Sequence, residues 1–175
     1  MGKAILITGA PGCGKTTIIQ RVIDRLPDIR GGFFTREIRQ GGLRKGFELI
    51  TLDGRHGILA HVELKSKQRV GKYGVNLSTL NGLAIETIQQ AIMQGGVVVI
   101  DEIGPMEIAS RGFCQAVLEA LESQAIVLGT IVQRSIPFTD GIKHHKHVTL
   151  IEVRLDNRDQ LPDQILAMLS GYTRL

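Results

Sequence analysis

The chain has 175 residues, 43 % of them hydrophobic and 22 % charged, and a formal net charge of +4. This size and composition are typical of one folded domain, and they exclude a disordered or fibrous protein. The longest apolar runs have only a few residues, so we expect no membrane-spanning segment. Two cysteines, Cys13 and Cys114, are too few for a disulfide framework, which favours a cytoplasmic protein.

The first part of the chain changes from an α/β pattern to a glycine-rich one. A strand is predicted over residues 4–8, and apolar residues three and four positions apart then predict a helix that ends near Pro27. Residues 31–60 contain short runs of branched and aromatic residues separated by glycine pairs, which predicts two or three antiparallel strands. Between Arg25 and Lys72 there are eleven Lys and Arg residues against five Asp and Glu, and this basic middle region favours an anionic ligand.

The rest of the chain alternates helical and strand-like segments. Helices are predicted over residues 79–94, 107–123 and 157–169, and strands over residues 97–100, 125–132 and 147–153. Unbroken apolar runs in these strands indicate burial on both faces, as in a parallel sheet. We therefore expect one α/β domain over residues 1–175, with a mostly parallel sheet covered by helices on both faces. The glycine-rich segment would form an antiparallel excursion after the first helix.

A glycine-rich sequence joins the first predicted strand to the first predicted helix. It consists of Gly9, Ala10, Pro11, Gly12, Cys13, Gly14, Lys15 and Thr16, which match the P-loop pattern GxxxxGK[ST], followed by Thr17. In this motif the glycines let backbone N–H groups surround phosphate oxygens, and the start of the helix adds partial positive charge. Lys15 would reach the β- and γ-phosphates, and the Thr16 hydroxyl would ligate Mg²⁺.

An acidic pair ends the buried strand in the segment VVVIDEIG. Because α/β sheets bind ligands at the carboxyl ends of their strands, Asp101 would lie beside the P-loop. We expect Asp101 to hold Mg²⁺ through a water molecule, which is the Walker B role. Glu102 could orient the water that attacks the γ-phosphate or accept its proton; alternatively it caps a helix or pairs with a lysine.

The sequence does not decide two further points: the role of Thr130 and the identity of a transition-state arginine. Thr130 follows the apolar run AIVLG, where its hydroxyl could contact the γ-phosphate or the attacking water, or only cap the strand end. Phosphoryl transfer also uses an arginine to neutralise charge in the transition state. The candidates are Arg36, Arg39, Arg44, Arg111 and Arg134.

Beyond these motifs, the sequence resembles a known family: the small P-loop nucleoside-triphosphatases first described from heat-loving microbes, the cancer-related nucleoside-triphosphatase family. The resemblance runs in order through GAPGCGKTT, GGFFTREIRQGGLRKGFELITLDG, VGKYGVNL, VVVIDEIGPMEIAS, LGTI and DNRDQLP. It implies a RecA-like α/β fold. It also implies slow, Mg²⁺-dependent hydrolysis of ATP, GTP and other nucleoside triphosphates to the diphosphate and phosphate.

The resemblance also implies site residues. Phosphate binding carries over to Gly9, Gly12, Gly14, Lys15 and Thr16. A second nucleotide-contacting segment carries over to Val98, Val99, Ile100, Asp101, Glu102, Ile103 and Gly104. The sequence departs from the family pattern after LGTI, where residues 133–147 replace a short loop, so no family role carries over to that segment.

These observations predict a nucleoside-triphosphatase in which Glu102 and Lys15 are catalytic and Thr16 and Asp101 hold Mg²⁺. No NKxD-like segment selects guanine, so we expect broad base specificity. Two alternatives remain: a nucleotide or small-molecule kinase whose basic middle region binds an acceptor, and a nucleotide-gated RNA-binding switch. An aromatic content of 4 % gives little support to RNA binding. We expect a monomer that binds no membrane.

Overall fold

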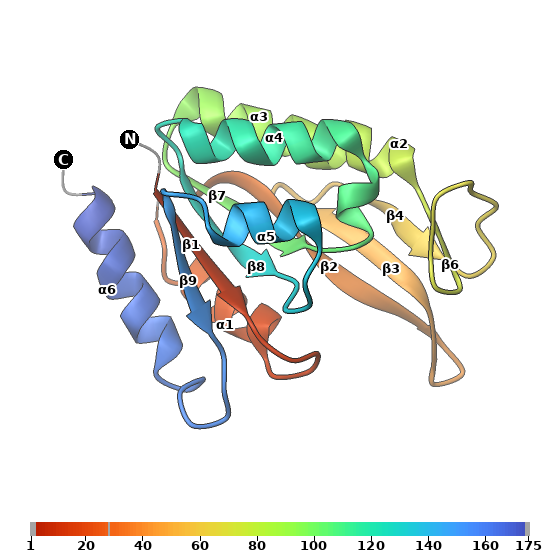
Figure 1. The fold of residues 1–175 in the computed structure, drawn as a ribbon, viewed down its shortest axis with the longest axis horizontal. Coiled ribbons are helices and arrows are strands. Elements are labelled where there is room, and N and C mark those ends of the chain that lie inside the picture. The colour runs from red at the N-terminus through yellow and green to blue at the C-terminus, as the bar shows by residue number, and fades with distance from the viewer. Residues whose placement is uncertain (1–2, 28, 174–175) are drawn as a thin grey trace.

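One nine-stranded sheet lies at the centre of the computed structural model, which describes residues 3–27 and 29–173 (Figure 1). The strands lie in the order β5-β6-β4-β3-β2-β7-β8-β1-β9. Their bounds are β1 (Lys3–Thr8), β2 (Ile29–Gln40), β3 (Leu43–Thr51), β4 (His56–His61), β5 (Arg69–Val70), β6 (Tyr73–Val75), β7 (Val97–Ile103), β8 (Ile126–Ile131) and β9 (Val148–Glu152). The neighbours β2, β7, β8, β1 and β9 are parallel, and β3, β4, β6 and β5 extend the sheet in antiparallel order.

Apolar strands build the parallel half of the sheet. The side chains of residues 4–7 in β1, 97–100 in β7 and 127–128 in β8 are all buried, although successive residues on a strand point to opposite faces. A strand can be apolar throughout only where both faces of the sheet are covered. The burial predicted from the unbroken apolar runs is therefore confirmed for β7 and β8. It is wrong for β9, which lies at the edge of the sheet and has no buried side chain.

Helices cover the two faces of this parallel half. The helical segments are α1 (Lys15–Ile23), α2 (Leu77–Thr79), the π-helical η1 (Leu80–Ala84), α3 (Ile85–Gln94), the 3-10 segment η2 (Glu107–Ala109), α4 (Arg111–Glu122), α5 (Pro137–Lys143) and α6 (Leu161–Thr173). Figure 1 shows α3 and α4 side by side over one face, where Ile88 and Phe113 are buried. On the other face, α1 and α6 bury Ile19 and Ile165. In the described residues, no helix has both the length and the apolar content to cross a membrane.

Strand β2 joins the parallel half to the antiparallel extension. Its first part pairs with β7, where Gly32 lies beside Val99, and its second part pairs with β3, where Glu37 lies beside Phe47. A Cβ on Gly32 would come within 2.0 Å of the Val99 carbonyl oxygen, so only glycine fits this close approach. The predicted antiparallel excursion is confirmed. It also contains β5 and β6, which were not predicted because their polar, basic stretch of sequence shows no strand-like alternation.

Two helical predictions and one loop prediction differ from the structure in detail. The helix expected over residues 79–94 begins two residues earlier and consists of α2, η1 and α3. The helix expected over residues 157–169 is α6, which starts at Leu161 because turns occupy the residues before it. The segment 133–147, treated as a loop, contains α5. A helix this short, with Gly141 inside it, leaves too weak a periodicity to predict.

Candidate active site

A glycine-rich loop joins the end of β1 to the start of α1. Gly12 and Gly14 have φ values of 77° and 100°, in the left-handed region that favours glycine. The Lys15 ammonium donates hydrogen bonds to the carbonyl oxygens of Gly9 (3.0 Å) and Ala10 (3.2 Å), so this side chain folds back over the loop. The first N–H groups of a helix have no partner within the helix, which makes the start of α1 suited to an anion.

The first acid at the end of β7 is held by the neighbouring strand. Asp101 is 2 % exposed, and the Thr130 hydroxyl on β8 donates a hydrogen bond of 2.5 Å to its Oδ1 atom. Burial raises the pKa of Asp101, while the hydroxyls of Thr130 and Thr16 and the charge of Lys15 oppose the rise. This role of Thr130, in which its hydroxyl orients Asp101, was not among those considered from the sequence.

The second acid at this strand end is more accessible. Glu102 is partly exposed, and burial together with the carboxylate of Asp101 raises the pKa of Glu102, while Lys15 lowers it. A carboxylate with a raised pKa accepts a proton more readily than an ordinary one. Glu102 is therefore chemically suited to act as a base.

One cavity of about 430 Å³ brings the loop and the acidic pair together. Its lining comes from the loop and α1 (Pro11, Gly12, Gly14, Lys15, Thr16 and Thr17), from β2 and β3 (Thr35, Glu37, Arg44 and Phe47), and from β7 (Asp101 and Glu102). The cavity lies at the carboxyl ends of the parallel strands, where α/β sheets bind ligands. Its volume is in the range of small-molecule sites.

Asp101 keeps one carboxylate oxygen without a partner. Its Oδ2 atom is buried and accepts no hydrogen bond from the described residues, and the Thr16 hydroxyl lies close to the same carboxyl group. Proteins hold Mg²⁺ through one or two carboxylates together with substrate phosphates. In the described part of the chain, no cluster of three or more His, Cys, Asp or Glu could hold a metal alone. Thr16 and Asp101 thus fit a magnesium ion that a bound nucleotide completes.

A third acid, which the sequence analysis did not single out, lies beside Glu102. Glu107 of η2 is 5 % exposed, and burial together with the charge of Glu102 raises the pKa of Glu107 to about 8. A Cβ built on Gly104 would lie 2.9 Å from Glu102 Oε1 and 3.1 Å from Glu107 Oε2, so both carboxyl groups flank the same glycine. At neutral pH Glu107 is mostly protonated, which leaves Glu102 without a second charged neighbour on that side.

We expect Glu107→Gln to remove part of the pH dependence of stability. The folded protein keeps Glu107 protonated up to about pH 8, whereas the unfolded chain releases this proton near the ordinary pKa of 4.5. The contribution of Glu107 to the free energy of unfolding is fully present below pH 4.5. It decreases as the pH rises to about 8, by at most about 1.4 kcal/mol per pH unit. Urea unfolding across this range measures the slope. Glu119→Gln, on the exposed surface of α4, is the control, and equal slopes in both variants would contradict the prediction.

Only one of the five candidate arginines lines the cavity. Arg44 lines it: its guanidinium lies 5.2 Å from the centroid of the Phe47 ring and donates hydrogen bonds to Glu37 and to the Tyr73 hydroxyl, both of 3.0 Å. The other four lie outside the lining: Arg36 pairs with Glu48, Arg39 pairs with Glu37, Arg111 begins α4, and Arg134 lies on the exposed segment after β8. Arg44 is therefore the candidate that the fold brings to the acidic pair.

Several residues expected to bind nucleotide lie outside the lining. Gly9, Ala10 and Cys13 belong to the loop, but they do not border the cavity. Four side chains of the second expected segment are fully buried in the core, namely Val98, Val99, Ile100 and Ile103. Because these four pack between sheet and helices, they position β7. Of the second expected segment, only Asp101 and Glu102 line the cavity, and Gly104 does not.

The sequence reasoning missed the part of the lining that comes from the antiparallel hairpin. Thr35 and Glu37 lie two positions apart on β2 and therefore on the same face of the strand, and Phe47 lies opposite Glu37 on β3. The alternation in FFTREIR could have placed Thr35 and Glu37 on one face of a strand. Nothing in the local pattern could have shown that this face turns toward the glycine loop.

Comparison with known proteins adds an independent observation. A family model described as NTPase matches residues 4–166. The chain belongs to this NTPase family. It is 44 % identical over 165 residues to nucleoside-triphosphatase THEP1 of Thermotoga maritima, covering 94 % of both chains. It is 38 % identical over 188 residues to the cancer-related nucleoside-triphosphatase of Homo sapiens, covering 98 % of this chain and 99 % of the relative.

Two solved structures of the NTPase family have the same fold. The crystal structure of THEP1 from the hyperthermophile Aquifex aeolicus matches with a TM-score of 0.87 at 34 % identity, covering 97 % of this chain and 99 % of the other. The solution structure of a human cancer-related nucleoside triphosphatase matches with a TM-score of 0.81 at 35 % identity, covering 99 % and 100 %. The family resemblance and the mixed α/β fold predicted from the sequence are therefore confirmed.

Proposed function

We propose that this chain is a Mg²⁺-dependent nucleoside-triphosphatase that slowly hydrolyses ATP, GTP and other nucleoside triphosphates to the diphosphate and phosphate. The observation that carries the proposal is the cavity in which Lys15 and Thr16 of the loop meet Asp101 and Glu102 of β7. Phosphoryl transfer to water requires a phosphate-binding loop, a metal position and a group that orients the nucleophile. The relatives named nucleoside-triphosphatase support the same reaction.

The loop would bind the triphosphate. Backbone N–H groups at the start of α1 would donate to phosphate oxygens, and Lys15 would exchange its carbonyl partners Gly9 and Ala10 for the β- and γ-phosphates. Thr16 and Asp101 would hold Mg²⁺, which when bound neutralises charge on these phosphates. Lys15 and the metal ion would thus lie next to the negatively charged phosphates of the substrate.

Glu102 would act on the attacking water. Its carboxylate would orient a water molecule toward the γ-phosphorus and take a proton as the new P–O bond forms, while the bond from phosphorus to the β–γ bridging oxygen breaks. The raised pKa of Glu102 supports this role, because a more basic carboxylate holds the proton better. Glu107, protonated at neutral pH, adds no competing charge.

The lining supports broad base specificity. Phe47 is the one aromatic side chain among the described residues that line the cavity. A ring can stack on any base, because every base has a π-face. A site that depends on stacking rather than on hydrogen bonds to base edges would accept ATP, GTP, CTP and UTP alike.

We assign the transition-state arginine to Arg44. Removing one positioned donor to developing charge lowers turnover by about 10²–10³-fold, and we expect this loss of kcat in Arg44→Ala. Arg36→Ala is the matched control, because Arg36 lies on the same hairpin but pairs with Glu48 outside the cavity. Steady-state hydrolysis measures both variants, with thermal unfolding to verify folding. An equal loss in the two variants would argue for a general effect on the hairpin.

The experiment that tests the function is phosphate release from ATP, GTP, CTP and UTP, with Mg²⁺ and with a chelator, in the absence of any acceptor. We expect slow release from all four nucleotides that stops when the metal is removed. Release that needs an added acceptor would contradict hydrolysis and favour a kinase. Release that persists in the chelator would contradict the assignment of Thr16 and Asp101 to a metal.

A further inference from the structure

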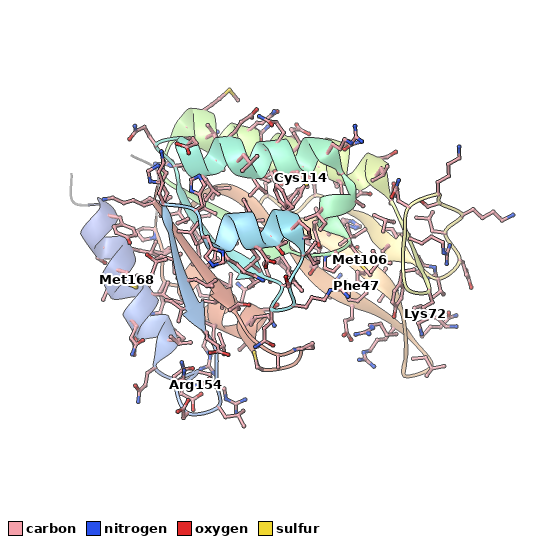
Figure 2. All side chains as sticks on the ribbon, in the orientation of Figure 1. Phe47, Lys72, Met106, Cys114, Arg154 and Met168 are labelled. Carbon is pink, nitrogen blue, oxygen red and sulfur yellow. The ribbon has the colours of Figure 1, made fainter. Side chains whose placement is uncertain are left out.

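A second cavity, of about 650 Å³, shares Arg44 with the first. Its other charged lining residues are Arg39 at the end of β2, Lys45 on β3, and Lys72 in the turn between β5 and β6. Figure 2 shows Lys72 at the antiparallel end of the molecule, farther out than Phe47 of the first cavity. Two strands and a turn thus bring four cationic side chains to one cavity.

The charge of this second cavity is not balanced by its surroundings. None of the seven described residues that line it is acidic. Glu37 lies next to it and is shared, because it accepts from both Arg39 (2.6 Å) and Arg44 (3.0 Å). Within the described part of the chain, Lys45 and Lys72 form no ion pair. A concave surface with uncompensated charge of one sign concentrates ligands of the opposite sign.

The uncharged residues that line the second cavity indicate what kind of ligand it could bind. Leu43, 66 % exposed, and Val62 add apolar surface, while Tyr73 is 7 % exposed and uses its hydroxyl to accept from Arg44. A small anionic molecule with a less polar body matches such a site. A nucleic-acid strand matches less well, because strand binding depends on exposed aromatic rings on which bases stack, and Tyr73 is buried.

We propose that this second cavity binds a phosphomonoester, a small molecule that carries a terminal phosphate, beside the triphosphate site. Lys45 and Lys72 would donate to the phosphate oxygens, and Arg39 and Arg44 would contribute further positive charge. The binding itself does not depend on the activity of the first cavity.

Arg44 links the two cavities. Because one guanidinium borders both, a phosphomonoester and a nucleoside triphosphate would share it and repel each other. Each ligand would therefore weaken binding of the other by the same factor. This coupling rests on the proposed function, and its signature is a higher KM for ATP when the phosphomonoester is present.

The test is calorimetric titration with ribose 5-phosphate, with ribose as the control that lacks the phosphate. Each charged hydrogen bond is worth about 1.5–3 kcal/mol, so we expect Lys45→Gln/Lys72→Gln to lose at least about tenfold in affinity. Lys65→Gln/Lys67→Gln removes two exposed lysines outside the cavity and should bind like wild type. Thermal unfolding of both double variants verifies that they fold.

The proposal would be overturned by equal binding of ribose and ribose 5-phosphate, by equal affinity in the two double variants, or by loss of the ribose 5-phosphate signal in Lys15→Ala. The last would show that the probe occupies the glycine loop instead. Binding of a single-stranded RNA without binding of ribose 5-phosphate would also overturn it, in favour of a nucleic-acid site. An unchanged KM for ATP would overturn the coupling alone. A protein that hydrolyses no triphosphate but binds ribose 5-phosphate would refute only the proposed function.

Discussion

Glu102→Gln should keep its affinity for the Mg²⁺–nucleotide complex but lose about 10²–10⁴-fold in turnover, the usual effect of removing a general base. Glutamine has the same shape and fills the same position beside Gly104, but its amide cannot accept the proton of the attacking water. It also removes a carboxylate that raises the pKa of Glu107, so that carboxyl should titrate at lower pH in the variant. Single-turnover phosphate release and nucleotide titration measure the rate and the affinity separately.

The matched control for Glu102→Gln is Glu119→Gln, which makes the same chemical change on the exposed surface of α4. It should hydrolyse at the wild-type rate. If Glu102→Gln loses nucleotide binding, the carboxylate belongs to the metal site or to folding. If Glu102→Gln turns over normally, another group activates the water, and the base assignment is wrong.

The parallel half of the fold could be predicted because its signals are local. Residues 97–100 and 126–128 are apolar at every position, which only a strand covered on both faces permits. β5 and β6 could not be predicted, because strands of two and three residues are too short to show alternation. β6 pairs with β4 and β5 pairs with β6, and these pairings depend on tertiary contacts rather than on the residues of the two strands.

The residues of the candidate site also fall into those that could be predicted from local sequence and those that could not. The loop around Lys15 and the acids Asp101 and Glu102 could be predicted, because each lies in a short motif whose chemistry depends on neighbours in sequence. The choice of Arg44 among five arginines could not, because it depends on how the β2–β3 hairpin packs against the loop. Glu107 was visible in the segment DEIGPME, but its burial depends on η2 packing behind β7.

Lys15→Ala should lower kcat/KM for every nucleoside triphosphate by more than about 10³-fold. Lys15 is the cationic side chain of the loop, and its charge would contact phosphate oxygens in both the bound substrate and the transition state. A charged hydrogen bond contributes about 1.5–3 kcal/mol to binding, and a positioned donor adds about 10²–10³-fold in turnover. Loss of both effects accounts for the expected decrease. Nucleotide titration and phosphate release measure the two contributions.

The fold should survive this substitution, because Lys15 is partly exposed and its only hydrogen bonds in the described structure reach two carbonyl oxygens of the same loop. Lys65→Ala, an exposed lysine outside both cavities, is the control and should keep wild-type kinetics. A folded Lys15→Ala variant that hydrolyses ATP at an undiminished rate would mean that the loop is not the phosphate site. The acidic pair would then have to act on a ligand bound from the hairpin side, where Arg44 and Lys45 supply the remaining positive charge.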